Sequence, residues 1–115
     1  MGSILTSIKK LCQVAEADTS FDTDLIIYIN SALTKLKELG VGPVEGVSIA
    51  DSTQTWVGLY GEDVDQTLIR LFVYINVRLI FDPPTSSFVL DALRKELSET
   101  EWRLYVKADN ELVTE

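Results

Sequence analysis

The sequence lacks several residue types on which common enzyme and metal sites depend. None of its 115 residues is a histidine, and Cys12 is its single cysteine. Internal disulfides, zinc sites built from His and Cys, and catalytic Ser-His or Cys-His pairs are therefore excluded. The six glycines show no phosphate-binding spacing such as G-x-x-x-x-G-K-[ST]. We expect no enzymatic activity, no cofactor and no metal ion.

Basic residues and long apolar runs are also scarce. Ten Lys and Arg stand against eighteen Asp and Glu, which leaves a net charge of -8. Because affinity for phosphate backbones is largely due to cations, tight DNA binding is not expected. The longest apolar stretch, residues 68–81, contains Arg70, Asn76 and Arg78 and is too short and too polar to cross a bilayer. With no signal or transit peptide evident, we expect no membrane association.

What the sequence does contain is an apolar pattern with a helical period. The chain length suits one domain, residues 1–115. The spacing predicts helices at residues 4–15, 22–39, 63–81 and 86–107, with Ser3, Asp22 and Ser86 or Ser87 as N-caps and Gly40 as the residue that ends the second helix. We predict an all-α fold, a bundle of four to five helices, followed at residues 108–115 by an acidic tail that we expect to be mobile.

Residues 40–62 form one long irregular loop in this prediction. Residues 47–49 are compatible with a short β element, and Asp51 can cap one or two turns that carry Trp56, Leu59 and Tyr60. Long loops in compact domains are usually functional, so these three residues are candidates for a partner surface. The alternative is a loop folded over the core with Trp56 as its plug, which we favour for Trp56 itself.

Two other features have structural explanations. Glu62, Asp63 and Asp65 cluster at a predicted helix start, where negative charge stabilises the helix dipole. Cys12 lies on the apolar face of the first helix, so we expect a buried and unreactive thiol.

The last predicted helix carries two apolar strips. Leu90, Leu93, Leu97 and Leu104 form a core stripe, and two four-residue charge pairs, Asp91 with Lys95 and Glu99 with Arg103, are expected on its solvated faces. Away from that stripe, a second strip consists of Trp102, Tyr105 and Val106. Either the first helix or a neighbouring subunit must cover this second strip, and we predict a subunit boundary or a partner contact there.

Four segments in order resemble a known family. They are residues 40–43 (GVGP), 55–56 (TW), 77–84 (VRLIFDPP) and 99–104 (ETEWRL). Together they resemble the small head-tail connector, or adaptor, proteins of tailed bacteriophages and prophages. The resemblance covers residues 4–107, and the chain departs from better-known members in having no long C-terminal extension for portal docking.

The resemblance implies a non-enzymatic structural protein of the virion. Such connectors assemble in the host cytoplasm as a ring of about twelve copies beneath the portal protein, and join the head to the tail or to a stopper protein. DNA passes through the lumen of the ring without specific binding. In isolation the chain would be a monomer if the portal is needed to template the ring.

Two other functions fit the residues less well. One is a small helical prophage-encoded regulator or inhibitor that binds a single partner protein. The other is a carboxylate-based hydrolase, which would need a base or metal cluster that the spacing does not provide.

Overall fold

The described part of the protein consists of helices and the loops that connect them, as the sequence predicts. The structure, a computed structural model, describes residues 2–62 and 66–113, with side chains as far as Ala108. Its helices are α1 (Ile4–Leu11), α2 (Asp22–Glu38), α3 (Trp56–Tyr60), α4 (Thr67–Phe81) and α5 (Ser87–Val113). Within these residues the only β pairing is an isolated bridge between Ser3 and Thr55. The all-α prediction is therefore confirmed, and residues 47–49 form no strand.

Local signals fix several helix ends. Ser3 caps α1, because its Oγ accepts a hydrogen bond from the Thr6 N–H at 3.3 Å. At the end of α2, Gly40 takes φ 89°, and the Val41 N–H donates to the Leu36 carbonyl at 2.9 Å. This is a Schellman ending, which requires a left-handed residue and therefore favours glycine.

The start of α2 differs from the prediction. Asp22 does not cap the helix with its side chain; it is the first helical residue, and its Oδ1 lies 2.8 Å from the Lys9 Nζ. Phe21 precedes it and sets its ring edge-on against Phe81 at the end of α4, with 5.2 Å between ring centroids. Contacts to distant residues thus position this end of α2.

The irregular segment between α2 and α3 is fastened to the helices. The Asn30 side chain both accepts from the Ile49 N–H at 2.8 Å and donates to the Ile49 carbonyl at 3.0 Å. The N-cap of α3 is Thr55, whose hydroxyl accepts from the Gly58 N–H. Asp51, the predicted cap, instead accepts from the backbone and hydroxyl of Thr53.

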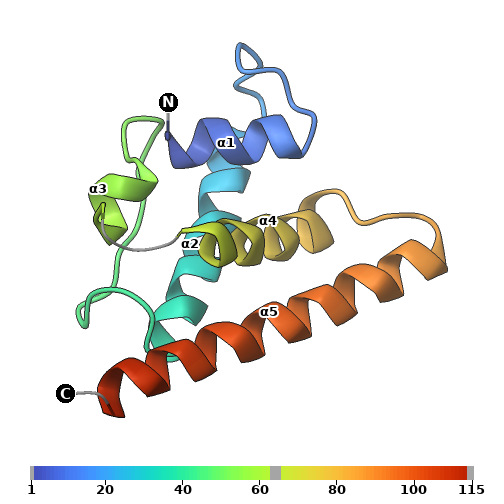
Figure 1. Ribbon diagram of the computed structural model, residues 1–115. Coiled ribbons are helices and arrows are strands. Elements are labelled where there is room, and N and C mark those ends of the chain that lie inside the picture. The colour runs from blue at the N-terminus through green and yellow to red at the C-terminus, as the bar shows by residue number, and fades with distance from the viewer. Residues whose placement is uncertain (1, 63–65, 114–115) are drawn as a thin grey trace.

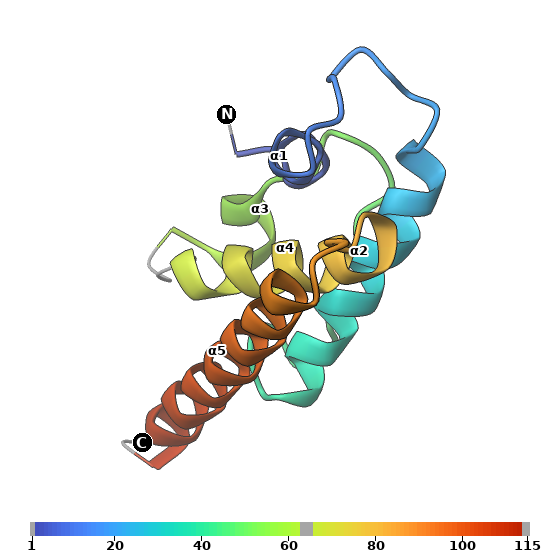
Figure 2. The same ribbon diagram turned by 90° about the vertical axis from the view of Figure 1, so that its right-hand side faces the viewer.

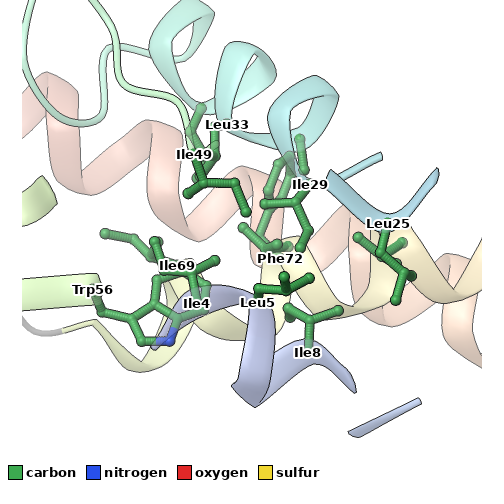
Figure 3. Close-up of a cluster of buried hydrophobic side chains, with 14 of the residues drawn as sticks. Ile4, Leu5, Ile8, Leu25, Ile29, Leu33, Ile49, Trp56, Ile69 and Phe72 are labelled. Atoms are coloured by element: carbon green, nitrogen blue, oxygen red, sulfur yellow. The ribbon is translucent and has the colours of Figure 1, made fainter. Parts of the chain in front are cut away.

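Helix α4 is the centre of the molecule. It packs against α2, α5 and α1, and α1 also contacts α2 (Figures 1 and 2). Side chains from α1, α2, α3, α4 and the loop residue Ile49 converge on one core (Figure 3). Helix α5 lies along the edge of the molecule, and α4 is its main helical neighbour.

Three predicted boundaries need correction or fall outside the description. Helix α1 ends at Leu11 rather than at the predicted residue 15. Helix α5 continues to Val113, beyond its predicted end at residue 107 and into the predicted acidic tail, and residues 114–115 lie outside the described residues. Helix α4 begins at Thr67. Its predicted start at residue 63, with Asp63 and Asp65, also lies outside the described residues.

Candidate protein-interaction surface

Trp56 lies in the core. Its side chain is 0% exposed and points from α3 toward Ile4 and Ile69 (Figure 3). The indole Nε1 donates to the Ser7 Oγ at 3.4 Å, and the Arg70 guanidinium lies 5.5 Å from the ring centroid. The structure therefore matches the plug interpretation of Trp56, since a fully buried indole offers no surface to a partner.

Tyr60 is also buried, whereas Leu59 is half-buried. The Tyr60 ring packs on Gly42, where an added Cβ would come within 2.7 Å of the Tyr60 Cε1. Its hydroxyl finds no hydrogen-bond partner among the described residues, and burial raises the pKa of Tyr60 to about 12. Of the three candidates on this segment, Leu59 alone keeps partial access to solvent, so a partner contact here stays a prediction.

A groove lies beside α3. It has a volume of about 640 Å³ between the end of α1, α3 and the first half of α4. Leu11 and Val57 border it with exposed side chains, and Leu71 and Tyr74 line it from α4. Leu11 is the last residue of α1, and its exposed side chain faces the groove. The groove is one accessible apolar surface.

The second apolar strip of the last helix is exposed. Trp102 is 63% exposed, and its ring lies 6.1 Å from that of Tyr105, which is also exposed. Val106 is half-buried. Helix α1 packs on α2 and α4 instead of on this strip. No element of the described chain covers the two rings, which leaves the partner contact as a prediction.

The side of α5 that faces the core is narrow. Leu104 and Thr100 are buried, and Leu97 is partly buried against the core. Leu90 and Leu93, predicted for the same stripe, are half-buried. Helix α5 therefore packs against the rest of the protein along one narrow stripe of residues, and most of its other described side chains are exposed to solvent.

Phe88 is a surface residue that the sequence analysis missed. Its side chain is 82% exposed near the start of α5. The available signal was spacing: Phe88 precedes Trp102 by fourteen residues, which places both on the same side of a helix. Phe88 and Trp102 thus lie at the two ends of one face of α5.

Lys9 is a buried cation inside the fold. Its side chain is 4% exposed, and Nζ donates to the Glu16 carbonyl at 3.0 Å and to the Asp18 carbonyl at 2.7 Å, besides its ion pair with Asp22. These three bonds tie the loop after α1 to the start of α2. Lys9 therefore stabilises the fold and offers no charge to a ligand.

Cys12 confirms the expectation of a buried thiol. Burial raises the pKa of Cys12, and the nearby Asp82 carboxylate adds to the rise. A thiol with a raised pKa is a poor nucleophile at neutral pH. Among the described side chains, no group of three or more His, Cys, Asp or Glu comes together as a possible metal site.

These observations define the general class of this protein. It is a small all-α protein with one buried apolar core, no assembled chemical site in its described part, and apolar residues exposed on its last helix. No described helix is long and apolar enough to span a bilayer.

Comparison with known families identifies the chain more closely. The family model described as phage connector protein matches residues 4–111. The chain therefore belongs to the phage connector protein family, as its resemblance to head-tail connectors predicts. Searches of curated proteins and of solved structures gave no match.

Proposed function

We propose that this protein is a head-tail connector of a tailed phage. In this role it forms a ring of about twelve copies beneath the portal protein and joins the head to the tail or to a stopper protein. Family membership over residues 4–111 is the observation that carries the proposal. The site of action is then the neck of the virion, reached from the host cytoplasm during assembly.

The subunit has two different accessible surfaces, as ring assembly requires. Subunits that close a ring with more than two copies meet head to tail, so each needs two unlike faces. The exposed face of α5, with Phe88 and Trp102, is one accessible apolar surface. The groove bordered by Leu11 and Val57 is another, and it is formed by α1, α3 and α4 rather than by α5. We propose that these two faces meet between neighbouring subunits.

The charge of the chain suits a DNA channel. A net charge of -8 repels phosphates, so a ring of many copies would let DNA slide without holding it. The proposed function needs no catalysis, cofactor or metal ion.

The test replaces an exposed tryptophan without disturbing the core. Trp102→Ala should reduce head-tail joining and leave an excess of tailless heads, while the free chain keeps its thermal stability, because Trp102 is 63% exposed. Ile27→Ala is the matched control, since Ile27 is an equally exposed apolar residue on α2. Normal joining by the Trp102→Ala variant would refute the role of this face.

A further inference from the structure

The outward face of α5 carries a heptad pattern. Starting from Phe88, the residues on this side follow one another at steps of four, three, four, three and four: Phe88, Ala92, Lys95, Glu99, Trp102 and Val106. We call these six residues the α5 seam. Residues spaced in this way line one side of a helix, as the contact positions of two-stranded coiled coils do, and four of these six are apolar. At 1.5 Å per residue the seam is about 27 Å long.

The α5 seam has no partner within the described chain. Five of its residues are exposed and Val106 is half-buried. The α5 residues that are buried or packed against the core, Leu97, Thr100 and Leu104, lie on another side of the helix. Figures 1 and 2 show α5 along the edge of the molecule. The seam is therefore accessible to a second molecule.

The charges in the middle of the seam are also unpaired. Lys95 and Glu99 form no ion pair in the described structure, in which Lys9 with Asp22 is the only one. The expected pairs of Asp91 with Lys95 and of Glu99 with Arg103 are not formed either. Both central charges are thus free to meet opposite charges on another chain.

The seam is complementary to itself when two copies run antiparallel. With a twofold axis near residue 97, Lys95 of each copy faces Glu99 of the other. The same register places Trp102 opposite Ala92, the smallest residue of the seam, and Phe88 opposite Val106. The two Lys95–Glu99 layers then lie in the middle of the interface, with apolar layers on either side of them. In each layer an a position of one helix faces a d position of the other, as in antiparallel coiled coils.

Other alignments of the seam are unfavourable. A parallel pair would set Lys95 on Lys95 and Glu99 on Glu99, which places like charges opposite each other. A shift of the antiparallel pair by one heptad would set these charges against apolar residues instead and leave them buried without partners. The charge pattern thus selects one orientation and one register.

We propose that the free protein forms an antiparallel dimer through the α5 seam, with a second copy of this chain as the partner. An interface made by one helix pair belongs to the small and weak class. Glu96 adds to this weakness, because the two Glu96 side chains lie on the same edge of the pair near the axis. We expect a dissociation constant in the micromolar range, about 1 to 100 µM.

The dimer acts as a reserve form of the connector, and this part of the inference rests on the proposed function. A twofold interface is closed and cannot extend to a ring. It also covers Trp102, which the proposed ring needs. Two free copies would therefore block each other until docking at the portal replaces the dimer contact.

Charge reversal gives a sharp test by sedimentation of the full chain at increasing concentration. The wild type should dimerise, whereas Lys95→Glu alone and Glu99→Lys alone should each dimerise at least about tenfold more weakly, because each faces like charges across the seam. An equimolar mixture of the two variants should recover the dimer, since every charge then meets its opposite. Circular dichroism should stay unchanged, because both residues are exposed.

Each contrary result would overturn the dimer. A wild type that remains monomeric at about 1 mM, a variant that associates as strongly as the wild type, or a mixture that stays monomeric would all do so. Orientation is read from spin labels at Lys107→Cys. Antiparallel copies offset the labelled positions by about 30 Å along the helix axis, whereas parallel copies place them at the same level, with only the spacing of about 10 Å between the helix axes. The short distance would also overturn it.

The dimer and the proposed function can fail separately. If the wild type does not dimerise but Trp102→Ala still prevents head-tail joining, the dimer is wrong and the connector function stands. If the dimer forms as described but Trp102→Ala joins heads to tails normally, the function of this face is wrong and the dimer stands.

Discussion

Trp56 and Trp102, the two tryptophans of the chain, occupy opposite environments. Trp56 is fully buried, whereas Trp102 on α5 is 63% exposed. Both residues can bury a large apolar area, so the difference lies in what surrounds them. Around α4 the side chains enclose an indole, whereas none of the described side chains covers the outer face of α5. The comparison shows that the core is complete without Trp102, which leaves that residue free for contact with another molecule.

Removing the buried indole should have the largest effect on stability. Trp56→Ala leaves a cavity among Ile4, Ile69 and their neighbours and removes the cation contact with Arg70. We expect a loss of about 3–5 kcal/mol in the free energy of unfolding, measured by urea titration. A loss below about 1 kcal/mol would mean that the core does not depend on this residue.

Replacing the buried Lys9 should cause the second largest loss of stability. Lys9→Met removes the donor of three bonds and leaves the Asp22 carboxylate and two backbone carbonyls without their partner. We expect a loss of about 2–3 kcal/mol by the same titration. The neighbouring Lys10 is exposed, so Lys10→Met is a matched control with little effect. Equal effects of the two variants would contradict the role of Lys9.

Because of the buried Tyr60 hydroxyl, we expect the free energy of unfolding to depend on pH under alkaline conditions. Its pKa is raised to about 12 by burial, so the folded protein holds this proton where the unfolded chain, with an ordinary value near 10, releases it. The resulting stability is complete below about pH 10 and is lost as pH rises toward about pH 12. Unfolding measured across this range should show the loss in the wild type and a smaller loss in Tyr60→Phe.

Tyr60→Phe should also have a small effect on the free energy of unfolding at neutral pH. The Tyr60 hydroxyl is buried without a partner among the described residues. Its removal should leave stability unchanged or raise it by about 1 kcal/mol. A clear destabilisation by Tyr60→Phe would show that the hydroxyl has a partner.

The smallest effect on stability is expected at Trp102. Trp102→Ala should change the free energy of unfolding by less than about 0.5 kcal/mol, because the side chain is mostly exposed and lies outside the core. Urea titration at concentrations below the dimer range measures this change. A loss comparable with that of Trp56→Ala would mean that α5 depends on Trp102 for its own packing.

Sequence patterns predicted the parts of the fold that depend on neighbouring residues. The all-α class, the Ser3 cap and the Gly40 ending each follow from signals within a few positions along the chain. Distant contacts decided the rest. Lys9 is buried because the loop after α1 folds over it, and spacing alone cannot show that loop.

The candidate surface was partly predictable for the same reason. Trp102 and Tyr105 fall outside the core stripe of their helix, which the helical period reveals. Whether Trp56 faces solvent depends on the pairing of residues 54–56 with the N-terminus, where the Trp56 N–H donates to the Gly2 carbonyl at 3.0 Å. This contact joins segments about fifty positions apart, so no local pattern predicts it.

The central claim is that the outer face of α5 is an assembly surface and that the core is not. Hydroxyl-radical footprinting of the two tryptophans tests it most directly, first in the dilute free chain and then in assembled phage particles. We predict strong oxidation of Trp102 in the free chain and strong protection in the particle, with Trp56 protected in both. Equal oxidation of Trp102 in the two states would contradict the claim.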